Sequence, residues 1–244
     1  MAELATAAPG WDYAARLTEV RARIHTTEYR SGRAGSNVKL LVATKAWDVG
    51  AAVAAVRAGA RLVGESRMQE LAVKGPALKA AGARIHVIGQ LQRNKAATAV
   101  DFADCVETVD SLSLAERLSR LCIEAGRELD VMIQVNVSGE ESKAGVSPAD
   151  ALTLAAAAQA LPALTVTGFM TIGLNSPDEV AVRAGYARLA ALRDEALIRS
   201  ERGELPLREA WELSMGMSND LEWAIAEGAT IVRVGTSVMG HRSR

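Results

Sequence analysis

Short apolar runs alternate with longer segments of mixed polarity along nearly the whole chain. The short runs are rich in β-branched residues and almost continuously apolar, which is typical of parallel strands covered on both faces. The predicted strands are residues 38–44, 61–64, 84–89, 105–109, 130–137, 164–170, 211–215 and 230–235. The segments between them, and a stretch over about 11–31 ahead of the first strand, are predicted to be helices.

Helix-boundary signals agree with this alternation. Residues 113–116 match a capping box, and Ser-Pro at 147–148 and at 176–177 puts proline at a first helical position. The sequence AGAR, at 58–61 and again at 81–84, puts glycine where a left-handed residue commonly ends a helix. Each of these helices is therefore predicted to lead directly into the next strand.

Eight strand–helix units within about 200 residues are what an α/β fold of the (β/α)8 TIM-barrel type requires. A doubly wound open sheet is the alternative, but it needs a glycine-rich phosphate turn after its first strand, and none follows residue 44. No proline- or serine-rich linker divides the chain. We therefore predict one barrel domain over residues 1–244, with a helical extension over residues 1–35.

Bulk composition narrows the classes of function. The chain has 244 residues, is 49% hydrophobic and 23% charged, and has a formal net charge of −1, so no general attraction to nucleic acid or membrane is expected. Neither Cys105 nor Cys122 belongs to a C-x-x-C pair, the N-terminus does not read as a secretory signal, and no apolar run reaches the length of a membrane span. We expect a reduced, cytoplasmic protein.

The barrel prediction fixes in advance where a site should lie. Barrel proteins place their sites at the carboxyl ends of the strands, and a phosphate site often follows strands seven and eight. The corresponding loops, SMGMSND at 214–220 and VGTSVMG at 234–240, combine glycine with hydroxyl residues, among them Ser218, Gly235 and Thr236. These loops predict a phosphate cradle. Ser218 also stands where the N-cap of the next helix belongs, so the alternative is that it only caps a helix and the glycines only make turns.

A lysine follows the first predicted strand, in LLVATKAW at 40–47. Closing the barrel would put this strand beside the eighth, so that Lys45 points into the same mouth as the two phosphate loops. A lysine beside a phosphate seat suggests a Schiff base with a phosphorylated aldehyde, for which pyridoxal 5'-phosphate (PLP) is the obvious candidate. Such a lysine reacts only as the neutral amine, which a desolvated site and neighbouring cations would favour. The alternative is a lysine that extends into solvent from a strand end.

The eighth strand carries an arginine on its inward face. Ile231, Arg233 and Gly235 share one side by the two-residue period of a strand. A buried arginine needs a partner, and the ring nitrogen of PLP would be one. Because arginine keeps its proton, that nitrogen would stay unprotonated and the ring would be a weak electron sink. A salt bridge to a carboxylate inside the barrel is the alternative. Lys143, after the fifth strand, is a further lysine that could reach the mouth.

Motifs spread over nearly the whole chain carry a family resemblance. They are VATKAW, VGESRMQE (63–70), HVIGQLQRNK (86–95), VNVSGEESKAGV (135–146), GFMTIG (168–173) and LSMGMSNDLEWAIAEGATIVRVGTSVMG (213–240). In these motifs the chain resembles the pyridoxal phosphate homeostasis proteins, whose fold is similar to the N-terminal barrel of alanine racemase. The last motif is long and specific. The chain departs from the family at Ser66, where the family usually has asparagine.

The resemblance implies a role for each candidate residue. It implies that Lys45 is the internal aldimine lysine and that Arg233 lies at the ring nitrogen of PLP. It assigns the phosphate to Ser218, Gly235 and Thr236. The whole candidate cofactor site, which also includes residues near the ring, is Lys45, Ser66, Met170, Ser214, Met215, Ser218, Arg233, Gly235 and Thr236.

The resemblance also implies a function, namely PLP binding for intracellular PLP (vitamin B6) homeostasis without dedicated turnover, catalytic residues or a metal. PLP-dependent apoenzymes are candidate recipients, and we expect a monomer. The alternative is a PLP-dependent amino-acid racemase, which needs a second base on the opposite face of the substrate. Tyr13, Tyr29 and Tyr186 lie in predicted helices away from strand ends, which disfavours it. A phosphosugar enzyme with a Schiff-base lysine is a third class, but no acid–base pair accompanies the lysine. The dispersed histidines do not suggest a metal site, and His86 is expected to be a hydrogen-bonded core residue.

Overall fold

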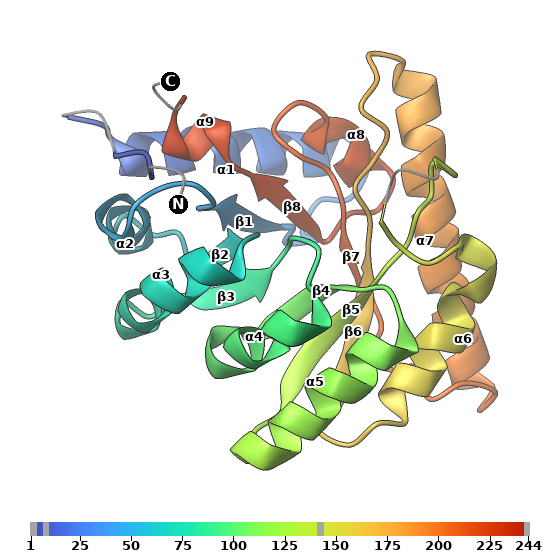
Figure 1. Ribbon diagram of the computed structural model, residues 1–244. Coiled ribbons are helices and arrows are strands. Elements are labelled where there is room, and N and C mark those ends of the chain that lie inside the picture. Colours follow the sequence, from blue (N-terminus) through green and yellow to red (C-terminus); the bar gives the residue numbers. More distant parts are fainter. Residues whose placement is uncertain (1–3, 7–9, 141–143, 242–244) are drawn as a thin grey trace.

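The structure is a computed structural model that describes residues 4–6, 10–140 and 144–241 (Figure 1). Eight parallel strands form a closed barrel in sequence order, and β1 pairs with β8 to close it. The strands are β1 (Lys39–Ala43), β2 (Leu62–Glu65), β3 (Arg84–Val87), β4 (Cys105–Val109), β5 (Leu129–Gln134), β6 (Leu164–Met170), β7 (Glu212–Ser214) and β8 (Ile231–Val234). The predicted (β/α)8 barrel is confirmed. Strand ends differ by a few residues from the predicted ones, most clearly in β5, which ends at Gln134 rather than at residue 137.

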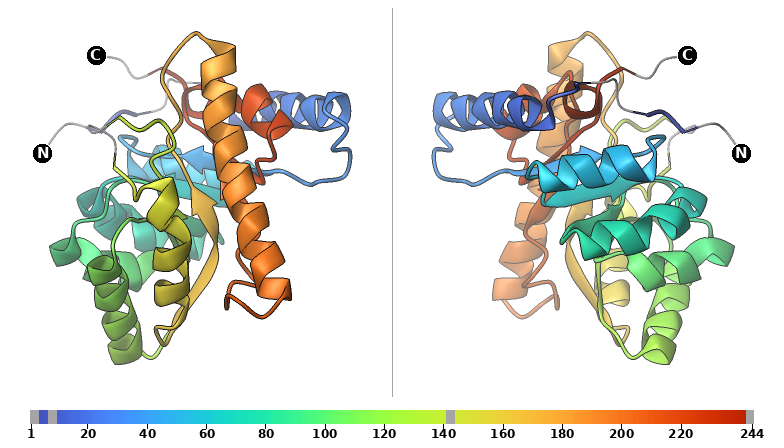
Figure 2. Two further views of the ribbon diagram at one scale, coloured as in Figure 1. Left: turned by 90° about the vertical axis from the view of Figure 1, so that its right-hand side faces the viewer. Right: turned by 90° about the vertical axis from the view of Figure 1, so that its left-hand side faces the viewer.

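Helices surround the strands, as Figure 1 shows. They are α1 (Tyr13–Arg30), α2 (Val49–Arg57), α3 (Met68–Ala80), α4 (Ala96–Phe102), α5 (Leu112–Ala125), α6 (Pro148–Gln159), α7 (Glu179–Glu201), α8 (Leu221–Ala226) and α9 (Thr236–Met239), with a short 3-10 turn, η1 (Arg93–Lys95), before α4. The helix α1 precedes the first strand and packs beside α8 and α9 (Figure 2). No helix of the described part of the chain is both long and apolar enough to cross a membrane.

Some of the predicted helix-boundary signals are found at the ends of the helices. Ser147 caps α6 through its hydroxyl, with proline next to it, as predicted. The left-handed glycines after α2 and α3 are also present, at Gly59 (φ +115°) and Gly82 (φ +83°).

Two predicted helix starts are wrong. The helix α5 begins after Ser111, so the expected capping-box residue Ser113 lies inside it. The helix α7 begins at Glu179 and is capped by Asp178, which accepts from the Ala181 N–H, so Pro177 precedes the helix. In each case a neighbouring residue with the same capping ability takes the position.

Apolar residues form two layers because strand side chains alternate in direction. The larger cluster fills the space between strands and helices. A smaller one fills the barrel interior with Leu41, Ala43, Leu62, Ile88, Cys105, Met132, Met170 and Ile231. Buried polar groups interrupt this inner cluster, and they lead toward the carboxyl ends of the strands.

Candidate functional site

A cavity of about 1030 Å³ lies at the carboxyl ends of the strands, and we call it the carboxyl-end cavity. Its lining comes mainly from the ends of β1 to β3 and from the loops after β6, β7 and β8. Most of the predicted cofactor residues line it, namely Lys45, Ser66, Ser218, Arg233, Gly235 and Thr236. Residues far apart in the sequence are thus gathered at the end of the barrel where the sequence placed a site.

Three predicted residues are fully buried and do not line this cavity. Met170 belongs to the inner apolar cluster, and Ser214 lies inside the barrel among polar groups. Met215 packs in the outer layer, between strands and helices. The alternation of side chains along a strand explains this difference, because Ser214 points inward and its neighbour points outward. The structure therefore does not bring the Met215 side chain to the cavity.

Lys45 stands in a turn two residues beyond the end of β1. Its side chain is exposed and lines the carboxyl-end cavity. The Lys45 side chain therefore points toward the cavity as predicted, but its surroundings are open to solvent rather than desolvated. The next residue, Ala46, has φ of +66°, in the left-handed region that residues with a side chain seldom adopt.

Arg233 is buried and points into the barrel, as predicted, with only 5% of its surface exposed. Its guanidinium donates to the Ser214 hydroxyl at 2.8 Å and to the Thr171 carbonyl at 2.7 Å. Among the described residues, no carboxylate forms a direct ion pair with it, so the salt bridge considered as an alternative is not found there. Burial lowers the pKa of Arg233, while the nearby Glu107 carboxylate acts in the opposite direction.

A chain of polar contacts continues from Arg233 through the barrel interior. The Ser214 hydroxyl donates to Oε2 of Glu107 at 2.5 Å, and Oε1 of Glu107 lies 2.7 Å from Nδ1 of His86. Burial by itself would raise the pKa of Glu107, but the contacts with His86, Arg233 and Ser214 lower it overall. His86 is the hydrogen-bonded core residue that the sequence predicted. Glu107 was not predicted, although its place among the inward residues of β4 was a signal.

The loop after β7 differs from the prediction in one respect. Ser218 is not a helix cap, because α8 begins at Leu221 and Asp220 is the N-cap residue. The carboxylate of Asp220 instead accepts from the N–H of Met217 at 2.5 Å. Ser218 therefore lies free of the capping role and lines the cavity. The glycine of this loop, Gly216, has φ of +90°, and a Cβ there would lie 2.4 Å from Cβ of Ala224.

The loop after β8 leads straight into the short helix α9. Gly235 precedes the helix, and Thr236 and Ser237 form its beginning, with all three residues lining the cavity. The first N–H groups of a helix have no carbonyl partner within it. This segment therefore presents hydroxyl groups and backbone donors to the cavity.

The donor set fits a phosphorylated aldehyde such as PLP. An amine from Lys45, a guanidinium from Arg233 and hydroxyls from Ser218 and Thr236 all face one cavity. Its volume is at the upper end of the roughly 300–1,000 Å³ found for small-molecule sites. One carboxylate, that of Asp220, also lines it and lies among the phosphate-binding candidates.

Tyr186 does not line the carboxyl-end cavity, but contrary to prediction it contacts Asp220, a residue that does. It lies on α7, but its hydroxyl donates to Oδ2 of Asp220 at 2.8 Å. A Cβ on Gly173, in the loop after β6, would lie 2.4 Å from that hydroxyl oxygen. Burial and the Asp220 carboxylate both raise the pKa of Tyr186. The length of the side chain carries the hydroxyl from the helix to the strand ends, which helix position alone did not reveal.

Several lining residues were not predicted. The loop after β6 contributes residues 172 and 174–177, the loop after β7 adds Asn219 and Asp220, and Trp223 comes from the helix α8. His241, near the C-terminus, also lines the cavity. The barrel rule makes every loop after a strand a candidate, and extending the search beyond the last two loops would have found these. Lys143 lies outside the described residues.

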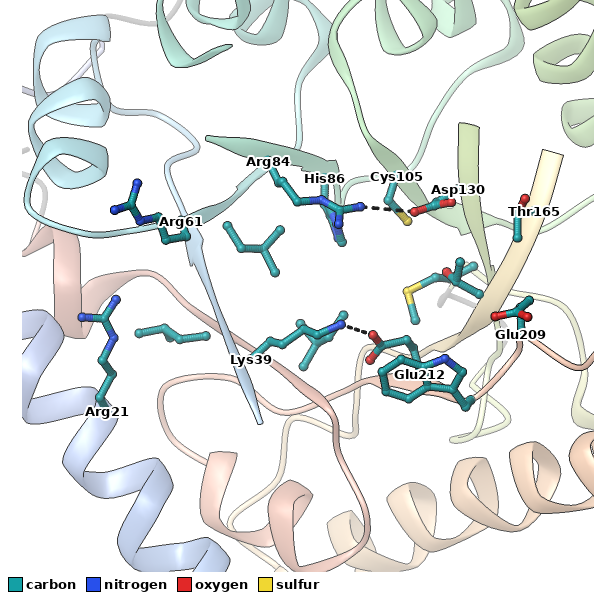
Figure 3. A pocket seen from close by; sticks show the side chains of 16 residues that line it. Arg21, Lys39, Arg61, Arg84, His86, Cys105, Asp130, Thr165, Glu209 and Glu212 are labelled. Atoms are coloured by element: carbon teal, nitrogen blue, oxygen red, sulfur yellow. Dashed lines mark hydrogen bonds and ion pairs between the residues drawn. The ribbon is translucent and has the colours of Figure 1, made fainter. Parts of the chain in front are cut away.

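A second cavity, of about 630 Å³, lies at the opposite, amino ends of the strands, and we call it the amino-end cavity (Figure 3). Basic side chains from α1, β1, β3 and the residue before β2 face acidic ones from β5, β7 and the segment before β7; they are Arg21, Lys39, Arg61 and Arg84, against Asp130, Glu209 and Glu212. Lys39 pairs with Glu212, and Arg84 lies 3.3 Å from Asp130. His86 lines this cavity as well, so the polar chain leading to Arg233 begins here.

The sequence profile of the family described as "Alanine racemase, N-terminal domain" matches residues 17–243. A pyridoxal phosphate homeostasis protein of Vibrio cholerae is 37% identical over 233 residues, which cover 93% of this chain and 94% of that protein. This chain belongs to the pyridoxal phosphate homeostasis protein family. A relative of the same name from Aquifex aeolicus is 38% identical over 229 residues, covering 93% and 97% of the two chains.

A solved structure agrees with this family membership. PipY of Synechococcus elongatus, in its form with PLP bound, is 33% identical and has a TM-score of 0.79, covering 94% of this chain and 100% of that one. The departure from the family pattern at Ser66 concerns the site itself, because Ser66 lines the carboxyl-end cavity.

Proposed function

We propose that this protein binds PLP and serves intracellular PLP homeostasis, with no dedicated catalytic turnover. The observation that carries the proposal is that Lys45 and Arg233, from neighbouring strands, face one cavity together with the hydroxyl-bearing loops. The relatives named for PLP homeostasis, and PipY with PLP bound, support the same cofactor.

Lys45 is the proposed covalent anchor. Its exposed side chain leaves Nζ accessible to an aldehyde in the cavity. With PLP in the cavity, Lys45 would supply the neutral amine that condenses with the aldehyde carbon, and the carbonyl oxygen would leave as water. When bound, PLP supplies an aldehyde carbon that can pass from one amine to another, which is the chemistry that a carrier needs.

The other candidate residues orient the ligand. Ser218 and Thr236 donate hydroxyl hydrogen bonds to the phosphate, and Gly235 leaves room for the backbone to approach it. Arg233 donates to the ring nitrogen and is itself held by Ser214. The remaining three act from the cavity wall or from beneath it: Ser66 lines the wall, whereas Met170 and Met215 support the strands that carry the site.

The racemase alternative requires a second base, and Tyr186 is a tyrosine that contacts Asp220 in the cavity wall. Its hydroxyl already donates to Asp220, and burial raises its pKa, so this phenol retains its proton rather than accepting one. An arginine at the ring nitrogen would in addition leave the ring a weak electron sink. Both features favour a carrier over a racemase.

Borohydride trapping tests the cofactor and its anchor together. PLP added to the purified protein should give a visible absorbance band, and reduction should add a pyridoxyl group that peptide mass spectrometry locates on Lys45. The Lys45→Ala variant should lose both signals. Lys39→Ala, which removes a lysine at the other end of the barrel, should lose neither. A colourless protein that gains no mass overturns the proposal, and labelling of another lysine overturns the choice of Lys45.

Hydrogen exchange at Cα tests the proposed lack of turnover. The PLP-saturated protein is incubated with L- or D-alanine in heavy water, and deuterium incorporation is followed together with stereochemical inversion. We expect negligible inversion. Exchange with inversion at about 1 per second or faster would be an ordinary enzymatic rate and would establish a racemase instead.

The remaining features of the proposal come from the sequence. They are one barrel domain over residues 1–244, a monomeric state, a cytoplasmic location, and PLP-dependent apoenzymes as recipients of the cofactor.

A further inference from the structure

We propose that the buried Lys74, together with Glu65 and Glu70, positions the turn that carries Lys45 for reaction with an aldehyde. These three residues are called the Lys74 cluster. The inference rests on the proposed function, in which Lys45 is the covalent anchor. It assigns a role to a charged group that lies outside the carboxyl-end cavity and touches no ligand.

Lys74 holds the turn by its backbone. It lies on α3 and is fully buried. Its ammonium group donates to the carbonyl of Thr44 at 2.9 Å and to the carbonyl of Trp47 at 3.2 Å. These two carbonyls stand on either side of the residues 45–46. One buried cation therefore fixes both ends of the turn.

The carboxylates of Glu65 and Glu70 contact both the Lys74 ammonium group and the turn. Glu65 lies 2.7 Å from the Lys74 ammonium and accepts from the Thr44 hydroxyl at 2.6 Å. Glu70 lies 3.1 Å from the same ammonium and accepts from the N–H of Ala46 at 2.6 Å. Ala46 is the residue in the left-handed conformation, which is unfavourable for a residue with a side chain. The contact with Glu70 is thus made at the strained position next to Lys45.

The cluster is costly as a stabilising element alone. Taking three charges out of water carries a large desolvation penalty, and apolar side chains of similar volume often serve stability at least as well. Oε2 of Glu65 is buried without a hydrogen-bond partner, which adds to the cost. What apolar side chains could not provide is a set of donors and acceptors that fixes the carbonyl and N–H groups around Lys45. This specific geometry is the reason to assign the cluster a positioning role.

Two ligands separate positioning of Lys45 from general integrity of the site. PLP carries the aldehyde that reacts with Lys45, whereas pyridoxine 5'-phosphate carries an alcohol in its place and shares the ring and phosphate. In Lys74→Met we expect the rate of borohydride-trappable adduct formation with PLP to fall at least tenfold. The affinity for pyridoxine 5'-phosphate should stay within about twofold of wild type.

A matched control and a second variant keep the test decisive. Glu212→Gln removes a buried carboxylate that pairs with a lysine at the amino end of the barrel, and it should change neither ligand's behaviour. If Lys74→Met does not fold, Glu70→Gln, which keeps the volume and weakens the hold on Ala46, is judged by the same criteria. An unchanged adduct rate, or equal weakening of both ligands, overturns the inference. A wild-type protein that forms no adduct overturns the proposed function instead.

Discussion

The two ends of the barrel both carry lysines, arginines and carboxylates, but they use them differently. At the carboxyl end the charged groups that support the site are enclosed, with Lys74 fully buried and Arg233 only 5% exposed. At the amino end the Arg84–Asp130 pair leaves 65% and 37% of the two side chains exposed. Exposed pairs contribute about 0–1 kcal/mol to stability, whereas buried charges are costly and tolerate little change in geometry. The comparison indicates that geometry is fixed more tightly around Lys74 and Arg233 than at the Arg84–Asp130 pair.

The two ends are nevertheless joined through the barrel interior. His86 lines the amino-end cavity and contacts Glu107, which accepts from Ser214, which in turn accepts from Arg233 at the other cavity. The interior of this barrel is therefore a continuous polar path set within an apolar cluster. A substitution at either end of this path should therefore lower the free energy of unfolding more than a substitution in the surface ion pairs around it.

The largest expected effect is a difference in stability between substitutions at the two ends of the barrel. Arg233→Met removes the donor to the Ser214 hydroxyl and to the Thr171 carbonyl, and it takes a cation away from Glu107. We expect the free energy of unfolding to fall by about 3 kcal/mol. The matched change Arg84→Met at the amino end should cost less than about 1 kcal/mol. Urea unfolding measures both, and similar losses would contradict the contrast between the two ends.

The next largest effect is a difference in ligand affinity between substitutions at the two ends of the barrel. Hydrogen bonds to charged groups contribute roughly 1.5–3 kcal/mol each. The double change Ser218→Ala/Thr236→Ala should therefore weaken PLP binding at least about tenfold while leaving unphosphorylated pyridoxal nearly unaffected. The control is Thr165→Ala/Thr167→Ala, which removes two hydroxyls that line the amino-end cavity and should alter neither ligand. Equal weakening of PLP and pyridoxal would mean that Ser218 and Thr236 support the fold rather than the phosphate.

The features that the sequence predicted well are those that follow from periodicity. Apolar strands alternating with helices predict a closed barrel, and closure alone places Lys45 beside the eighth strand. The inward direction of Arg233 follows from its two-residue spacing from Ile231. These inferences hold because the strand–helix alternation and the two-residue period of a strand determine them, independently of individual side-chain contacts.

The features that escaped prediction depend on partners from distant segments. Glu107 is only a polar residue within an apolar strand until His86 and Ser214, on other strands, are placed beside it. Tyr186 reaches Asp220 across a long gap in sequence, because of its side-chain length. Helix starts were missed where several neighbouring residues can cap equally well, as at Asp178. The sequence does not rank such competitors, since three-dimensional packing decides among them.

A third and smaller effect concerns the pH dependence of stability, because the pKa values of two buried carboxylates near the site shift in opposite directions. The pKa of Glu107 lies below its ordinary value of 4.5, so its contribution to stability is present above that pH and is lost as the pH falls through the lowered value. Burial raises the pKa of Glu65, so its contribution is present below pH 4.5 and is lost as the pH rises through the raised value. Glu107→Gln should flatten the acid side of the stability profile, and Glu65→Gln should remove a loss toward neutral pH.

Urea unfolding midpoints between about pH 3 and pH 8 check these opposite signs. The exposed Glu19→Gln variant, whose side chain is 62% exposed, serves as the control for a carboxylate at the surface. If both buried variants changed the profile on the same side, the assignment of opposite shifts to Glu107 and Glu65 would be wrong.

The smallest expected effect is the coupling between Arg84 and Asp130 at the amino end. Their side chains are 3.3 Å apart but largely open to solvent, so water and salt screen the attraction and each long side chain loses freedom when it pairs. A double-mutant cycle with Arg84→Ala and Asp130→Ala should give a coupling energy of about 0.2–1 kcal/mol that shrinks as salt is raised. PLP affinity should stay unchanged in all three variants, since the pair lies at the end of the barrel away from Lys45. A coupling of several kcal/mol, or a loss of PLP binding on breaking this pair, would show that the amino end holds its charges as firmly as the carboxyl end does.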